Sequence, residues 1–199
     1  MAKPMTRPAM HMSVMDAIYE RRSVRSYLPE RLDRDTIRAL LAVAVRAPTA
    51  VHEEPWAFVV VQDAGALKRL SDRAKPLFLE EVHRAHLDRG GHAFDIFASP
   101  EFNIFYNAGT LIVICARPMG PFIVADCWLA AENLMLAACS MGLGTCVIGS
   151  AVPALNTLEI KSELGIPAAL TAIAPIIVGV PSGETPRTAR KEPEVLYWR

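Results

Sequence analysis

An arginine-rich stretch near the start of the chain is the strongest candidate for binding chemistry. It holds three guanidinium groups and one hydroxyl within five positions: Arg21, Arg22, Ser23 and Arg25. Planar guanidinium forks bind phosphate or carboxylate through paired hydrogen bonds, and a hydroxyl adds a donor. Arg190 and Lys191 in the tail could complete the same anion site. The alternatives are a solvated basic surface that pairs with Asp16 and Glu20, and a flexible tail.

A connecting segment at residues 47–56 suits the close approach of a flat ligand. It joins a predicted helix to a predicted buried strand, and it combines small residues, prolines and one imidazole: Pro48, Thr49, Ala50 and His52. Functional groups collect on loops at the ends of strands. An ordinary connection is the alternative here.

A second segment, residues 141–149, contains Gly142-x-Gly144. A dinucleotide-binding interpretation fails, because the glycines follow a helix rather than a strand and Val147 stands at the third glycine position. We expect instead a glycine-lined loop that offers backbone N–H groups to a ligand.

Nucleophilic and metal chemistry find no support in the sequence. The 4 cysteines lie in apolar stretches and form no C-x-x-C pair: Cys115, Cys127, Cys139 and Cys146. We expect them to be reduced, buried thiols. The sequence also has no Ser-His-Asp order, no P-loop and no His-Glu-x-x-His motif. This pattern favours chemistry carried by a bound cofactor, so no side chain is assigned a catalytic role and none a metal.

The charge balance limits the partners. The 199 residues hold 21 Lys+Arg and 21 Asp+Glu, and this neutrality argues against binding nucleic acid or a membrane surface. Residues 1–50 and 184–199 are net basic, whereas residues 51–183 are net acidic. Hydrophobic residues make up 52% of the chain, which is more than one small core needs and predicts an oligomer with a large buried interface.

Neither a secretory signal nor a membrane span is predicted. Residues 1–12 lack the apolar run of a signal peptide and predict a disordered tail. The uncharged stretch 133–158 is long enough to cross a bilayer, but glycines and Pro153 divide it into shorter pieces. We therefore expect a cytoplasmic protein.

The apolar patterning predicts an α+β protein in which helices cover a mixed sheet. The first predicted helix runs from Ser13 to about residue 22, and the second begins after Asp33 and ends at Pro48. Three further helices are predicted over 63–89, with an interruption at Pro76, over 122–141 and over 152–164. Predicted strands are 56–61, 110–116, 145–148 and 171–180, and Pro175 implies an edge, an end or a bulge. Residues 90–106 are predicted to be irregular.

The predicted helix 122–141 is unusual because 16 of its 20 residues are apolar. A helix that is apolar nearly all round is buried on every side. In a protein of this size, we expect it at the centre of the fold or in a subunit interface.

Taken together and in order, these segments resemble the nitroreductase family of FMN-dependent NAD(P)H oxidoreductases. The similarity runs from about residue 15 to 198. It rests on RRSVRSY at 21–27, APTAVHEEPW at 47–56, AAENLMLAACSMGLGTCVIG at 130–149, IIVGVP at 176–181 and the basic tail with its tryptophan. The resemblance implies a mixed, mainly antiparallel sheet and an intertwined homodimer with two FMN sites at the interface. It also implies an FMN-binding domain over 13–180 and a C-terminal extension, 181–199, that wraps the partner subunit.

The resemblance also implies a role for each segment. Arg21, Arg22, Ser23 and Arg25 would contact the FMN phosphate and ribityl chain, and Arg190 with Lys191 would add the tail's contribution. Pro48, Thr49, Ala50 and His52 match a loop that reaches the flavin from the partner chain. Val147, Ile148 and Gly149 match the loop along the isoalloxazine, with a backbone N–H near N5.

The implied activity is a ping-pong transfer of two electrons from NAD(P)H through FMN to a nitroaromatic, quinone or similar small acceptor. One departure bears on it: the family's loop commonly has Asn-x-Gln before Pro-Trp, and this chain has His52-Glu53-Glu54. The alternatives are a flavin-binding or flavin-processing protein of the same fold without NAD(P)H turnover, and a cofactor-free interaction domain.

Overall fold

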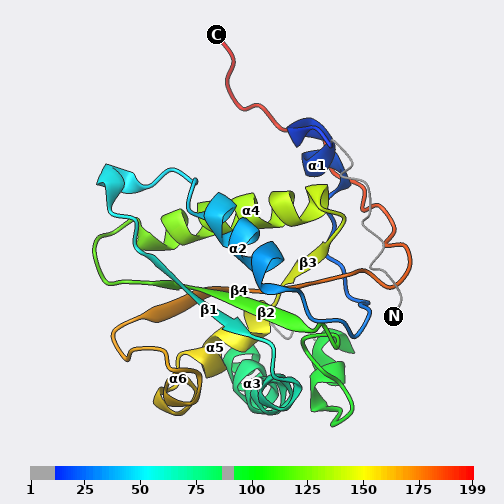
Figure 1. Ribbon diagram of the computed structural model, residues 1–199, viewed down its shortest axis with the longest axis vertical. Helices are drawn as coiled ribbons and strands as arrows, with labels where there is room; N and C mark the ends of the chain where they lie inside the picture. The colour runs from blue at the N-terminus through cyan, green and yellow to red at the C-terminus, as the bar shows by residue number, and fades with distance from the viewer. Residues whose placement is uncertain (1–11, 87–91) are drawn as a thin grey trace.

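The structure is a computed structural model that describes residues 12–86 and 92–199 (Figure 1). Of the predicted disordered tail 1–12, residues 1–11 lie outside the described residues. The centre of the fold is one four-stranded sheet in the order β1-β2-β4-β3. Its strands are β1 (Trp56–Val61), β2 (Thr110–Ala116), β3 (Gly144–Val147) and β4 (Thr171–Gly179).

All three strand pairings are antiparallel, so the predicted mainly antiparallel sheet is confirmed. The parallel component amounts to one isolated bridge, between Ser23 and Thr145, among the described residues. Strand β2 is buried at every position, as a continuous apolar run predicts for a strand covered on both faces.

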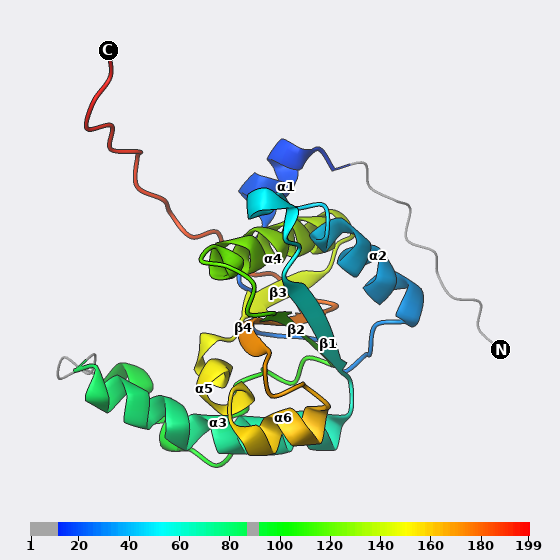
Figure 2. The ribbon, with the colours of Figure 1, turned by 90° about the vertical axis from the view of Figure 1, so that its left-hand side faces the viewer.

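Helices cover both faces of the sheet (Figures 1 and 2). On one face lie α2 (Arg34–Ala44) and α4 (Ile123–Ser140), with α1 (Val14–Glu20) against α4. On the other face lie α3 (Ala64–Arg84), α5 (Val152–Leu155) and α6 (Leu158–Leu164). The sheet has a hydrophobic core on each face, and successive residues of β2 point alternately into one core and the other. Ile112 and Ile114 pack with α2 and α4, whereas Leu111 and Val113 pack with α3 and α5.

Several predicted helix boundaries shift in the structure. Ser13 and Asp33 cap α1 and α2 as predicted, but α1 ends at Glu20 and α2 at Ala44, before the arginines and before Pro48. The predicted helix 152–164 is two helices: α5 ends at Leu155 with Asn156 as its C-cap, and Thr157 caps the start of α6.

The predicted interruption of α3 at Pro76 is wrong. A proline removes one backbone hydrogen bond and crowds the preceding turn. Buried residues on both sides of Pro76, Leu67 and Leu70 before it and Val82 after it, hold the helix on one face. Their packing outweighs the local cost.

Pro175 lies in β4, which is an interior strand rather than an edge. Its carbonyl accepts a hydrogen bond from Ile148 N at 2.8 Å, one residue beyond the end of β3 at Val147. Both backbone polar groups of an antiparallel residue point to the same side. The N–H that Pro175 lacks would therefore point toward a position beyond the end of β3, so no hydrogen bond between these two strands is lost. A register shift between Ile114 and Cys115 of β2 adds a bulge close by.

Helix α4 is buried on one side only within the chain. Its inward side chains join the core with β2 and β4, while Trp128 and Leu129 are 41% and 46% exposed. The helix is long and apolar enough to cross a membrane by length and composition, a test that core helices of soluble proteins also pass. The prediction that this helix lies at the centre of the fold is therefore wrong. Its location in a subunit interface stays a prediction.

Candidate functional site

Segment 23–28 and the start of the C-terminal tail meet beside β3. The extended segment 23–28 runs along this edge strand, where Val24 N donates to the Thr145 carbonyl at 2.9 Å. Further on, Leu28 N donates to the carbonyl of Val180 at 2.9 Å, at the point where the tail begins. These pairings fix the arginine-rich segment between the sheet and the tail.

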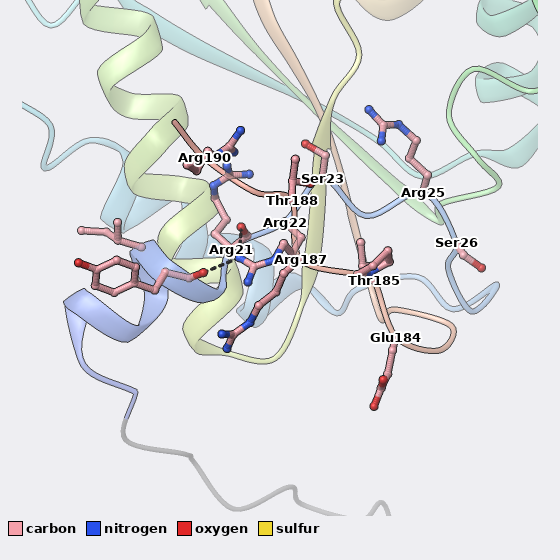
Figure 3. Close-up of a pocket in the computed structure, with 13 residues that line it drawn as sticks. Arg21, Arg22, Ser23, Arg25, Ser26, Glu184, Thr185, Arg187, Thr188 and Arg190 are labelled. Atoms are coloured by element: carbon pink, nitrogen blue, oxygen red, sulfur yellow. Dashed lines mark hydrogen bonds between the residues drawn. The ribbon is translucent and has the colours of Figure 1, made fainter. Parts of the chain in front are cut away.

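An open cavity of about 980 Å³ lies between α1, this segment and the tail. We call it the arginine cavity. Its lining includes the predicted Arg21, Arg22, Ser23, Arg25 and Arg190, together with residues 184–188 of the tail. Figure 3 shows Arg21, Arg22, Arg187 and Arg190 converging from the two segments. The structure thus brings the two basic groups together, whereas Lys191 does not line the cavity.

The cations of the arginine cavity differ in their partners. Arg22 donates to the carbonyls of Tyr19 and Arg21 at the end of α1, and both Arg22 and Arg187 pair with Glu20. Arg21 lies 3.8 Å from a carboxylate oxygen of Glu132. Within the described part of the chain, neither Arg25 nor Arg190 pairs with a carboxylate. At Arg25 and Arg190 the cavity therefore holds positive charge that no ion pair between described residues neutralises.

Arg25 connects this cavity to a second one. Its side chain points away from the other arginines (Figure 3) and lines a smaller pocket of about 90 Å³. We call this the aromatic pocket, and its walls include Phe97, Phe102, Tyr106 and the predicted Val147, Ile148 and Gly149. The guanidinium carbon of Arg25 lies 5.9 Å from the centre of the Tyr106 ring. A Cβ added at Gly149 would meet nothing within 4 Å, so the space beside this backbone is open.

The aromatic wall was missed by sequence reasoning, which classed residues 90–106 as irregular. A short 3₁₀ helix, His92–Ala98, precedes it, and aromatic contacts run from Phe78 through Phe97 and Phe102 to Tyr106, with ring centres 4.7–5.7 Å apart. The density of phenylalanine in this stretch was the available signal.

A buried lysine holds this wall in place. Lys75 of α3 is 6% exposed, and its Nζ donates to the carbonyls of Ser99 and Phe102 at 3.1 and 3.0 Å. Its charge also lies 3.3 Å from Asp72. Hydrogen bonds from a charged donor are stronger than neutral ones, so one buried side chain can fix an otherwise irregular loop.

The other predicted loop lies elsewhere in the chain. Pro48, Thr49, Ala50 and His52 surround the short 3₁₀ helix Ala50–His52, next to the start of α4 (Figure 1). Arg21 of the arginine cavity approaches Glu132 in the middle of α4, and it lines a smaller neighbouring pocket together with Cys139 near the end of this helix. At 1.5 Å per helical residue, the start of α4 lies about 14 Å from Glu132 and about 24 Å from Cys139 along the helix. One chain does not bring this loop to the arginine cavity.

Cys115, Cys127 and Cys146 are buried free thiols as predicted, whereas Cys139 is only half-buried. Burial raises the pKa of Cys115 to about 11 and that of Cys127 to about 12, and it also raises the pKa of Cys146 beside the aromatic pocket. These groups stay protonated at neutral pH, and thiols are poor nucleophiles. Among the described residues, no group of three or more His, Cys, Asp or Glu is arranged to hold a metal ion.

The two cavities of this fold have the lining that suits an elongated anionic ligand. A phosphate-sized anion suits the arginine cavity, and a flat, apolar group suits the space between Gly149 and the aromatic wall. The sheet with its two helical layers matches a solved nitroreductase with bound FMN from Bacteroides fragilis. That match has a TM-score of 0.79 and 25% sequence identity, and it covers 94% of this chain and 98% of that one.

The chain belongs to the nitroreductase family, whose family model matches residues 18–180. A protein of Archaeoglobus fulgidus, provisionally named NADH dehydrogenase/NAD(P)H nitroreductase, is 30% identical over 172 residues, which are 84% of each chain. An iodotyrosine deiodinase of Thermotoga neapolitana is 25% identical over 185 residues, covering 92% of this chain and 96% of that one. The resemblance inferred from the ordered motifs is thereby confirmed.

Proposed function

We propose that this protein is a cytoplasmic, FMN-dependent oxidoreductase that uses NAD(P)H to reduce a nitroaromatic, quinone or similar small acceptor. The observation that carries the proposal is the position of Arg25, which lines both the arginine cavity and the aromatic pocket. A ligand with a phosphate at one end and a flat ring at the other would fit these two cavities, which share Arg25.

The residues present suit FMN. Arg21 and Arg190 would hold the phosphate, with Ser23 as a hydroxyl donor, and Arg22 would support them from its place at the end of α1. The backbone of Val147, Ile148 and Gly149 would lie along the ring, because the side of Gly149 is open. Bound FMN would supply two-electron transfer between a reduced nicotinamide and the acceptor. The protein's residues would position the ring, exclude water and offer one pocket to donor and acceptor in turn, which is the basis of the ping-pong order.

A second copy of the chain would complete the site. Exposed apolar side chains gather on α1, on the outward side of α4 and in the tail, where Leu196 and Trp198 are 90% and 87% exposed. If two α4 helices packed antiparallel, the start of one would lie beside the end of the other. The loop of Thr49 and His52 would then reach the partner's flavin, and the extension 181–199 would lie over the partner subunit.

The electron donor can be tested directly. The purified protein should carry FMN, and NADH or NADPH added without oxygen should bleach the visible flavin absorbance within the mixing time of a stopped-flow experiment. Failure of both nicotinamides to bleach a flavin-loaded protein would contradict the proposed activity.

The same experiment separates the second candidate function. The exposed carboxylate of Glu54 stands beside His52 in the loop that would face the ring, and this charge would repel the phosphates of a nicotinamide dinucleotide. A protein that binds or consumes flavin with negligible NAD(P)H oxidation would support this alternative, whereas rapid turnover would exclude it.

The predicted homodimer has its own test. Sedimentation should give twice the chain mass of 21.8 kDa, and Trp128→Glu with Leu129→Glu should give monomers that retain little flavin. Charges buried in an apolar interface cost several kcal/mol, about enough to dissociate a dimer of moderate affinity. Leu158→Glu is the control, because Leu158 is 74% exposed on α6, at the opposite face of the sheet. A dimeric double variant would show that the interface lies elsewhere.

A further inference from the structure

The loop that carries His52 has an unusual backbone. Three non-glycine residues adopt the left-handed backbone conformation: Val51 (φ 46°), His52 (φ 57°) and Glu54 (φ 46°). This conformation is unfavourable for any residue with a Cβ and most unfavourable for β-branched valine. Local strain of this kind persists where the surrounding structure enforces it.

The side chains of Val51 and His52 do not account for the strain. Val51 is 84% exposed, and His52 is also exposed. Neither side chain therefore gains packing within the chain from the unusual backbone. The conformation directs both side chains outward from the start of α4.

One buried carboxylate fixes the loop to the helix. Asp126 in the first turn of α4 is 3% exposed, and its Oδ1 accepts a hydrogen bond from Ala50 N at 3.2 Å. The helix N-terminus stabilises a negative charge at this position. Thr49, just before Ala50, is extended, so this hydrogen bond lies where the chain enters the left-handed turn.

The burial of the Asp126 carboxylate does not stabilise the fold. Its Oδ2 is buried and has no hydrogen-bond partner among the described residues. A buried acceptor without a partner is destabilising, so each such group calls for an explanation. The hydrogen bond to the strained loop is the role that the geometry offers.

We propose that Asp126 is a positioning residue that holds the loop 49–54 in its left-handed form, so that Val51 and His52 are presented to the flavin site of a partner subunit. This inference rests on the proposed flavin function. Asp126 itself would contact neither the flavin nor the acceptor, and it would act through the Ala50 N–H.

Hydrogen exchange of the flavin-free protein tests the structural half of the proposal. In Asp126→Ala, the amides of Ala50 and Glu53, which donate hydrogen bonds in this loop, should exchange at least tenfold faster, while those of β2 stay unchanged. Asp126→Asn keeps an oxygen acceptor for Ala50 N and should restore exchange to within about threefold of the wild type. Asp35→Ala is the matched control, because Asp35 also lies in the first turn of a helix but its side chain is 92% exposed and pairs with Arg38. Unchanged exchange in the loop, or faster exchange throughout the molecule, would overturn the proposal.

The functional half needs the flavin-loaded protein. Asp126→Ala should lower kcat/KM for the acceptor at least tenfold and alter the bound flavin spectrum, and Asp126→Asn should recover most of both. Ala50→Pro removes the donor while α4 stays intact, and the extended Thr49 is compatible with a following proline. It should also lower kcat/KM, and Asp126→Ala added to it should have little further effect.

The two halves separate this inference from the proposed function. A wild-type protein that binds no flavin would end the proposed function, yet loosening of the loop by Asp126→Ala would still establish what holds it. A flavin-loaded Asp126→Ala protein with a loose loop but unchanged spectrum and turnover would overturn the positioning role.

Discussion

The Arg21→Ala/Arg190→Ala double variant is expected to be purified almost free of FMN. The two side chains reach the arginine cavity from opposite ends of the sequence, and the chain neutralises them poorly: Arg21 has one distant carboxylate at 3.8 Å and Arg190 has none among the described residues. A hydrogen bond to a charged group contributes about 1.5–3 kcal/mol, so two losses should weaken FMN binding roughly 10²- to 10⁴-fold. Titration of the flavin-free protein with FMN, followed by flavin fluorescence, measures this change.

A control variant with the same loss of charge distinguishes loss of the binding site from a general effect of net charge. Arg34→Ala/Arg38→Ala removes two positive charges from exposed positions on α2, away from the cavity. This variant should bind FMN with an affinity within about threefold of the wild type. Full FMN occupancy in the Arg21/Arg190 variant would show that the phosphate lies elsewhere.

The anion-binding character of segment 21–25 was predictable because local chemistry specifies it. Guanidinium groups at such spacing, with a basic tail, suit an anion wherever the chain places them. The strands were predictable for a similar reason, since WAFVVV and TLIVICA can be buried on both faces of a sheet. Ser13 and Asp33 indicated their helices through the capping hydrogen bonds that they accept.

Features that depend on contacts distant in sequence were not predictable. Lys75 resembles an ordinary helical lysine, and its role is visible only when α3 lies beside the carbonyls of Ser99 and Phe102. Pro76 breaks a helix by local rules, yet the core keeps α3 continuous through it. Asp126 appears as a first-turn acid of α4, and its hydrogen bond to Ala50 crosses 76 positions of sequence.

Gly149→Val is expected to abolish FMN binding while the protein stays as stable as the wild type. Gly149 is exposed and lies outside the left-handed region that Gly142, Gly165 and Gly183 occupy, so its backbone accepts a side chain. A Cβ there meets no protein atom within 4 Å, and the added methyl groups would project into the space assigned to the ring. Thermal unfolding of the flavin-free protein should change by less than about 2 °C, which is under 1 kcal/mol for a domain of this size.

A second glycine should show the opposite behaviour. At Gly144, a Cβ would lie 2.8–2.9 Å from the side-chain carbons of Val24, which is stiff and paired to β3. Gly144→Ala should therefore lower stability by about 1–3 kcal/mol, as overpacking does, with a smaller effect on FMN affinity. Gly149→Ala should fall between the wild type and Gly149→Val in FMN affinity, since one methyl group fills less of the space. A Gly149→Val protein that binds FMN normally would place the ring away from this loop, because a flat ring and a valine side chain cannot occupy the same volume.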